Sequence, residues 1–269
     1  MALAINTNIM SLNAQRNVSS TNRGLATSME RLSSGLRVNS AKDDAAGLAI
    51  AERMTAQVRG LQVGIRNAAD GVSLAQTAEG ALGSMTEALQ RMRELSVQSA
   101  NASNSTTDRA SIDAEYQALN TEVNTIASRV TFNGLAILAA DAGAQAFQIG
   151  ANVGDTITVT TTDRSAVAPG GDVTTVANAN TAIGAIDAAL DIINSDRASL
   201  GAAMSQIDNA LSAQEATLQN TTAARGRIMD ADFAAETANL TRYQILQQAG
   251  ISMIAQANVA PQNVLALLQ

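Results

Sequence analysis

Two pairs of aspartates are the residues of this chain best suited to chemistry. Asp43 and Asp44 are adjacent, and Asp230 and Asp232 are separated by one residue. Paired carboxylates can serve as general acid and base or hold a divalent cation. Neither pair has a third carboxylate nearby in sequence, and the chain has no histidine and no cysteine. Both pairs stand where a helix should begin, and carboxylates there complement the helix dipole. We therefore interpret them as helix-start residues.

The rest of the composition also argues against catalysis. The chain has no imidazole base, no thiol and no glycine-rich phosphate loop, and only 2% of its residues are aromatic. Small-molecule pockets are usually lined by large apolar and aromatic groups. We expect no enzyme activity, no cofactor and no metal. The net charge of −7 also disfavours nucleic acid, which requires clustered cations.

The C-terminal stretch from Tyr243 to Gln269 carries no charged side chain and has apolar residues on every side of a helix. Such a helix has to be covered on every side. Its several amides argue against a bilayer, and no other segment reads as long and apolar enough to span one. The N-terminus also lacks the pattern of a cleaved secretory signal. We expect no membrane insertion and no cleaved signal peptide.

The N-terminal segment is the expected cover for this C-terminal helix. Its large apolar residues are interpreted as one stripe, formed by Ile5, Ile9, Leu12, Leu25, Met29, Leu32 and Leu36. The alternative is that the C-terminal helix folds into the core of its own chain.

Between the two terminal segments lie three series of apolar residues, here called ladders, in which the spacing alternates between three and four residues. They run from Met54 to Leu95, from Ile112 to Val130 and from Ile183 to Leu218, with one turn of the last skipped near Gln214. Spacing near 3.5 residues indicates a coiled-coil seam. The first rod, roughly 45–98, would be ~80 Å long and needs the other two ladders as cover. Capping-box spacing is present at Ser40–Asp43 and at Ser105–Asp108.

One region between the second and third ladders has a β pattern. Phe132-Asn133-Gly134 predicts a turn, residues 146–150 and 156–162 predict two strands, and residues 166–172 predict a loop. The predicted fold class is therefore mainly α: a long antiparallel coiled-coil bundle with a small β-hairpin region and paired terminal helices.

Long runs of this sequence resemble bacterial flagellin. The runs INTNIMSLNAQRN (5–17), ERLSSGLRVNSAKDDAAGLAIAERM (30–54), LQRMRELSVQSANASNS (89–105) and FNGLAIL (132–138) are similar to the amino-terminal half of that family. FQIGANVGDTI (147–157) and the run from Ala224 to Gln269 are similar to the rest. A hook–filament junction protein has related ends, but these segments are closer to flagellin.

The resemblance implies a structural subunit that self-assembles into the flagellar filament for swimming motility. It implies an inner layer of terminal helices, residues 1–35 plus 229–269, and an outer rod, residues 44–225, with a β-hairpin at about 132–165. The outer variable domain of larger members is essentially absent, with a short loop at 163–180 in its place. The alternative functions are a hook–filament junction protein or a coiled-coil adhesin.

The resemblance also implies partners and a location. The expected location is extracellular, in the bacterial flagellum, after export through the flagellar type III apparatus. The expected partners are further copies of this chain, an export chaperone at the C-terminal segment, and the filament cap and hook-junction proteins. The residues expected to serve assembly and the chaperone are Ile5, Ile9, Leu12, Leu25, Met29, Leu32, Leu240, Ile245, Leu246, Met253, Ile254, Val264, Leu265 and Leu268.

A last implied partner is the vertebrate receptor TLR5. The matching positions are Gln90, Arg91, Leu95, Gln98 and Glu115. Arg91 and Glu115 lie off the apolar ladders and should face outward. Leu95 lies on a ladder, so seam packing and receptor contact are both open for it, and all five residues could serve contacts between subunits.

Overall fold

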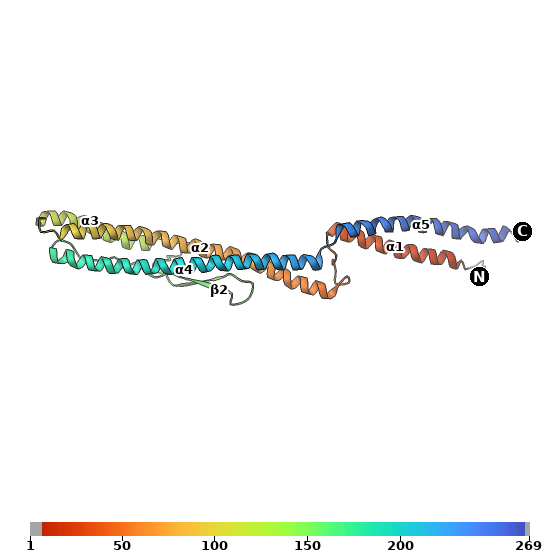
Figure 1. Cartoon of the computed structure of the whole chain (residues 1–269), viewed down its shortest axis with the longest axis horizontal. Helices are drawn as coiled ribbons and strands as arrows, with labels where there is room; N and C mark the ends of the chain where they lie inside the picture. The colour runs from red at the N-terminus through yellow and green to blue at the C-terminus, as the bar shows by residue number, and fades with distance from the viewer. Residues whose placement is uncertain (1–6, 267–269) are drawn as a thin grey trace. The chain divides into compact units, whose positions relative to one another are not determined.

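The computed structural model describes residues 7–266, with side chains up to Val259. Its elements, in chain order, are α1 (Ile9–Ser34), α2 (Ala45–Ser99), α3 (Thr106–Arg129), β1 (Ala144–Gln148), β2 (Thr156–Thr160), α4 (Val176–Met229) and α5 (Phe233–Ala266) (Figure 1). The chain divides into two compact units. We call Met1–Ala56 with Asn220–Gln269 the terminal unit, and Gln57–Gln219 the rod unit. The predicted mainly α class with a small hairpin is confirmed.

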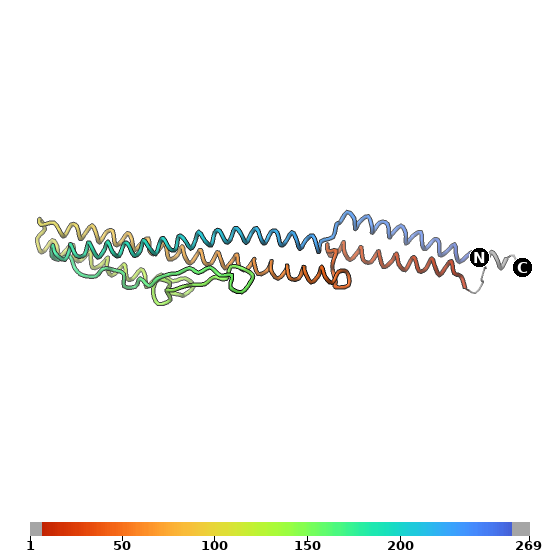
Figure 2. Tube along the Cα trace, turned by 60° about the horizontal axis from the view of Figure 1, so that its bottom comes forward, coloured from red at the N-terminus to blue at the C-terminus, as the bar shows by residue number. Residues whose placement is uncertain are grey.

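The rod unit is a bundle in which α3 and α4 cover the apolar ladder of α2 (Figures 1 and 2). Ion pairs join Arg93 to Asp187 and Glu79 to Arg197, so α2 and α4 run in opposite directions. The three predicted ladders supply most of the core, and its largest fully buried side chains include Tyr116, Leu82, Met85, Leu89, Met92, Ile186, Ile193, Leu200 and Ile207. The coiled-coil prediction is therefore confirmed for this unit.

The helix-start predictions are confirmed at two sites and wrong at a third. Ser105 and Asp108 form a reciprocal capping box at the start of α3, and Asp232 accepts hydrogen bonds from the N–H groups of Ala234 and Ala235 in the first turn of α5. Ser40 does not cap α2. Asp43 accepts from Ser40 within the preceding turn, and Asp44 accepts from the N–H of Gly47. Asp44 therefore caps α2, which begins at Ala45, because the Ser40–Asp43 hydrogen bonds close the turn before it.

The β region is a two-stranded antiparallel hairpin with Phe147 opposite Ile157. β1 begins and ends two residues earlier than predicted, and β2 ends two residues earlier, because each strand extends only over the residues that pair with the other. The turn predicted at Phe132 is confirmed: Phe132 pairs with Leu135, and Asn133 and Gly134 both have positive φ.

The hairpin lies close to α2 where that helix has no side chain. A Cβ at Gly64 would overlap the main-chain oxygen of Ile149, and a Cβ at Gly60 would meet Ala151. Asn67 donates to the main-chain oxygen of Gln148 at 2.8 Å. Glycine at these two helical positions therefore allows the backbone of the hairpin to approach the helix.

The predicted loop at 166–172 is confirmed, and polar side chains of α3 hold it. Asn120 and Asn124 accept from the N–H groups of Gly170 and Ala168, and Tyr116 donates to the main-chain oxygen of Gly170. This short segment stands between β2 and α4.

One expectation about membranes is wrong. Among the described residues, α4 contains an 18-residue stretch with mean hydropathy 1.2, so by length and composition alone it could cross a membrane. Its large apolar residues Ile186, Ile193 and Leu200 are buried in the core of the rod unit. The alanine-rich composition of a core helix accounts for this value.

We predict that Gly64→Ala lowers the free energy of unfolding by about 1–3 kcal/mol, because the added methyl group forces the hairpin away from α2. Gly80→Ala on the same helix is the control, since nothing lies within 4 Å of the added Cβ, and it should raise stability by about 0.5–1 kcal/mol. Thermal unfolding of the full chain, followed by circular dichroism, measures both. Equal effects of the two substitutions would contradict the close approach.

Candidate assembly surface

The terminal unit is built on an antiparallel pairing of α1 with α5 (Figure 2). Asn8 donates to the main-chain oxygen of Ala257 at 2.7 Å, and Gln247 donates to Asn22 at 2.9 Å. Arg31 at the other end of α1 forms an ion pair with Glu236. The partners run in opposite order along the two helices. The expectation that the two terminal helices pair with each other is confirmed.

Small and polar residues occupy several positions of the seam between these helices, beside larger half-buried residues such as Leu25 and Leu240. Ser11 and Ser28 are the buried residues of α1. Gly24 lies against the ring of Tyr243, where a Cβ would come within 2.6 Å of Cζ, and Gly250 lies against Val18. Side chains of this size let the helix axes approach but bury little apolar area. The internal pairing therefore leaves many of the large apolar residues of both helices without cover.

Ten of the large apolar residues of these helices are largely exposed. Ile9 and Met29 on α1 are 63% and 57% exposed, and Ile245 on α5 is 61% exposed. The other largely exposed apolar residues of these two helices are Met10, Leu12, Phe233, Leu246, Ile251, Met253 and Val259. We call these ten residues the assembly surface. Burying a single large apolar side chain is worth about 1.5–3 kcal/mol, so this surface favours association.

The expected single apolar stripe on α1 is not observed. Leu25, Leu32 and Leu36 are half-buried, whereas Ile9, Leu12 and Met29 are exposed. Leu25 follows Leu12 by about 3.6 turns, so the two lie on roughly opposite sides of the helix. The apolar residues of α1 therefore surround it, and only part of them faces α5.

The expected assembly residues of α5 divide in the same way. Leu240 and Ile254 are half-buried, and Ile245, Leu246 and Met253 are exposed. Ile5 and Leu268 lie outside the described residues, as do the side chains of Val264 and Leu265.

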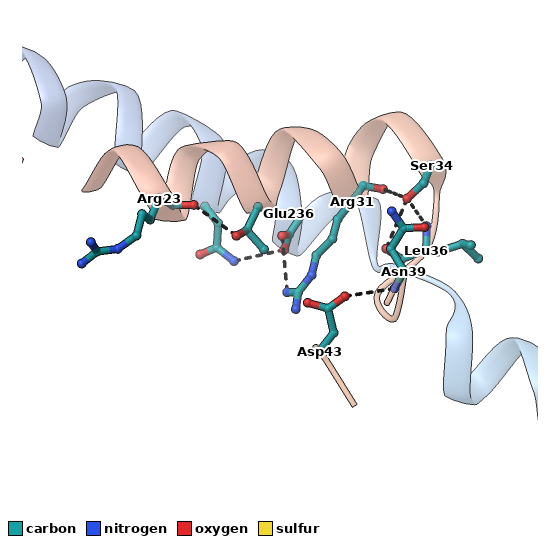
Figure 3. Close-up of polar contacts among 9 residues, drawn as sticks. Arg23, Arg31, Ser34, Leu36, Asn39, Asp43 and Glu236 are labelled. Carbon is teal, nitrogen blue, oxygen red and sulfur yellow. Dashed lines mark hydrogen bonds and ion pairs between the residues drawn. The ribbon is translucent and has the colours of Figure 1, made fainter. Parts of the chain in front are cut away.

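The segments that lead from these helices toward α2 and α4 are hydrogen-bonded to each other, next to the Arg31–Glu236 ion pair that Figure 3 shows. Gly35 ends α1 in the left-handed conformation (φ 72°), and its oxygen accepts from the N–H of Ala231 at 2.9 Å. Leu36 pairs with Asp230 in an isolated antiparallel bridge, and the Arg37 side chain donates to the main-chain oxygen of Ile228. We call segments 35–44 and 230–236, with Arg31, the elbow. Its hydrogen bonds fix how the chain enters and leaves the helix pair.

The five positions expected to contact TLR5 lie on α2 and α3 of the rod unit, and four are exposed. Arg91 hydrogen-bonds both Glu94 and Glu115 at 2.9 Å, and these hydrogen bonds raise the pKa of its guanidinium. Gln90 and Gln98 are also exposed. Leu95 is 2% exposed and belongs to the core, so of the two interpretations left open for it the structure supports seam packing.

Sequence reasoning found some half-buried residues of this seam, such as Leu25 and Leu32, but missed its small and polar members. The half-buried or buried positions recur every seven residues, as Ser11, Val18, Leu25 and Leu32 on α1 and as Glu236, Tyr243, Gly250 and Ala257 on α5. This period is the signal that could have revealed them. A search for large apolar residues alone passes over it, because Ser11, Glu236, Gly250 and Ala257 are small or polar.

Comparisons with known proteins agree with this architecture. Residues 5–142 match the model of the bacterial flagellin N-terminal helical region, and residues 183–268 match that of the C-terminal helical region. A flagellin of Halalkalibacterium halodurans is 44% identical over 273 residues, covering 99% of this chain and 100% of that protein. Polar flagellin B/D of Vibrio parahaemolyticus is 34% identical over 377 residues, covering 100% of both chains. The longer relative fits the interpretation of this chain as a short form.

Two solved structures are also similar. The crystal structure of Bacillus cereus flagellin has a TM-score of 0.52 and 34% identity, covering 55% of this chain and 88% of that one. A putative flagellar hook-associated protein from Vibrio parahaemolyticus has a TM-score of 0.61 at 15% identity, covering 70% of this chain and 100% of that one. The second likeness concerns the fold alone. With both helical regions matched and a full-length relative at 44% identity, this chain belongs to the bacterial flagellin family, the structural subunits of the flagellar filament.

Proposed function

We propose that α1 and α5 form the inner tube of the filament by burying the assembly surface against neighbouring copies, while residues 44–225 form the outer rod. The observation that carries this proposal is the outward placement of ten large apolar residues on a helix pair that comes into close contact at small residues such as Gly24 and Gly250. Exposed apolar patches of this kind mark interaction sites. Different faces of α1 and α5 carry them, so one copy needs several neighbours.

The composition of the two helices suits folding during assembly. Fixing the backbone of a residue costs about 1–2 kcal/mol of conformational entropy. The small apolar area buried between α1 and α5 offsets little of that cost. The terminal helices are then disordered in the free subunit and become ordered when other copies bury the assembly surface. Such coupling keeps the subunit from polymerising at low concentration.

The same property fits the route by which the subunit reaches the filament. Export through the flagellar type III apparatus without a cleaved signal requires a chain that unfolds readily, and a cytosolic chaperone shields the C-terminal segment until then. An amphipathic helix that docks in a groove is the expected binding mode. Cap and hook-junction proteins meet the same terminal helices at the two ends of the filament. Co-purification of the cytosolic form with and without residues 230–269 tests the chaperone.

We predict that Ile245→Ser raises the critical concentration for polymerisation about tenfold or more, since burial of that side chain is worth about 1.5–3 kcal/mol. Gln244→Ser, at the adjacent exposed position, is the control and should change it less than twofold. Sedimentation of polymer at increasing subunit concentration measures both. Removal of Tyr243–Gln269 should leave a folded rod that forms no filaments, and filaments from that truncated chain would refute the proposal.

A second candidate function is recognition by TLR5 through the rod. Four of the five implied positions are exposed. Arg91 hydrogen-bonds Glu115 of α3 and Glu94 of its own helix, so the Glu115 contact joins α2 to α3 at this place. An ordered guanidinium with neighbouring carboxylates and amides offers a preorganised polar surface to a receptor. Leu95 supports this surface from beneath, because it packs in the core.

We predict that Arg91→Ala weakens TLR5 signalling about tenfold or more while filaments still form. Arg93→Ala is the matched control: Arg93 is two residues away and similarly exposed, but it pairs with Asp187 of α4 instead. A reporter-cell assay with purified monomer measures signalling, and electron microscopy checks the filaments. An equal loss of signalling in both variants would contradict a specific role of the Arg91 surface.

A further inference from the structure

Three of the ten residues of the assembly surface are methionines. Met10 and Met29 on α1 are 62% and 57% exposed, and Met253 on α5 is 63% exposed. Each of these thioethers is therefore within reach of small solutes in the subunit.

The other methionines of the described chain are covered by the subunit itself. Met85 and Met92 are inaccessible to solvent in the core of the rod unit. The half-buried methionines are Met54, Met204 and Met229. The chain has nine methionines in all, of which Met1 lies outside the described residues. The exposed thioethers of the described residues are thus concentrated on the surface proposed to bind other copies.

Methionine is the residue of this chain that a mild oxidant attacks. Thiols and thioethers are the side-chain groups that climb the oxidation ladder, and the chain has no cysteine. With hydrogen peroxide, the thioether sulfur takes one oxygen atom, the O–O bond breaks, and the other oxygen leaves as water. The sulfur is oxidised by two electrons and the peroxide is reduced by two. The product, methionine sulfoxide, is polar where the thioether was apolar.

A sulfoxide on the assembly surface opposes association. Burial of this surface is favourable because it removes apolar side chains from water. A sulfoxide oxygen is a hydrogen-bond acceptor, and taking it out of water without supplying a donor costs free energy. Oxidation at these positions therefore removes a favourable contribution to polymerisation and adds an unfavourable one.

We propose that Met10, Met29 and Met253 form an oxidation site that controls assembly. Hydrogen peroxide converts them to sulfoxides in the free subunit, and the oxidised subunit no longer polymerises at concentrations where the reduced subunit does. This inference rests on the proposed function, because that function buries the three side chains against neighbouring copies. Filaments that have already formed resist the same oxidant, since their assembly surface is covered.

The modification is reversible. Methionine sulfoxide reductases restore the thioether, one enzyme for each sulfoxide epimer. A thiol reductant supplies the two electrons and is oxidised to a disulfide, while the sulfoxide oxygen leaves as water. An oxidised subunit can therefore regain its assembly surface without new synthesis.

The first test treats the purified free subunit with hydrogen peroxide, locates the sulfoxides by peptide mass spectrometry and measures the critical concentration by sedimentation. Sulfoxide should appear at Met10, Met29 and Met253 before Met85 and Met92, because susceptibility follows exposure. The critical concentration should rise about tenfold or more. Treatment with both reductases and dithiothreitol should restore it. A subunit that polymerises normally with all three sulfoxides in place, or one that stays inactive after full reduction, would overturn the inference.

Substitution by leucine assigns the effect to these positions. A variant that combines Met10→Leu, Met29→Leu and Met253→Leu keeps apolar side chains of similar volume that peroxide does not oxidise. Its critical concentration after peroxide treatment should differ from its own untreated value by less than about twofold. Met204→Leu, at a half-buried position of the rod unit, is the matched control and should remain as sensitive as the wild type. Equal sensitivity of the combined variant and the wild type would overturn the inference.

Oxidation of sedimented filaments separates this inference from the proposed function. Sulfoxide should form more slowly at the three positions in the filament than in the free subunit. Oxidation of all three at the same rate in both states would refute the proposed function, because the assembly surface would then be uncovered in the polymer. Protection in the filament together with unchanged polymerisation of the oxidised subunit would refute the inference alone.

Discussion

The close approach of α1 to α5 is the constraint on which the assembly account depends. Gly24 against Tyr243 and Gly250 against Val18 leave no room for larger side chains in the seam. Much of the large apolar area of both helices therefore lies on the outside of the pair in this subunit. This close pairing fixes the geometry of the two helices but leaves much of their apolar surface exposed. It thus prepares a surface for neighbours.

In the rod unit, by contrast, most of the large apolar residues are buried within the chain itself. Its ladders bury their largest residues completely within one chain, with Tyr116, Leu82 and Ile193 inaccessible to solvent. Hydrogen bonds from α3 hold the loop that precedes α4, and a glycine-lined face of α2 receives the hairpin. Stability from internal packing in one unit and from association in the other allows a subunit that persists before assembly and polymerises only with copies of itself.

The sequence predicted much of the rod and less of the terminal unit, for physical reasons. Apolar ladders with steps of three and four fixed the helices of the rod, and the seam role of Leu95 was one of two interpretations already open for it. The stripe on α1 was wrong, because large residues at irregular spacing surround a helix instead of lining one side. The contacts of Glu236 and Arg31 could not be predicted, since they join segments about two hundred residues apart in sequence. Capping at Asp44 instead of Ser40 was missed because two overlapping hydrogen-bonding motifs compete there.

Amide hydrogen exchange of the same protein as free subunit and as filament tests the central claim most directly. The account predicts rapid exchange in α1 and α5 of the free subunit, strong protection of both helices in the filament, and protection of α2 and α4 within residues 57–219 in both states. Strong protection of α1 and α5 in the free subunit would contradict it, because the helix pair would then be stable without its neighbours.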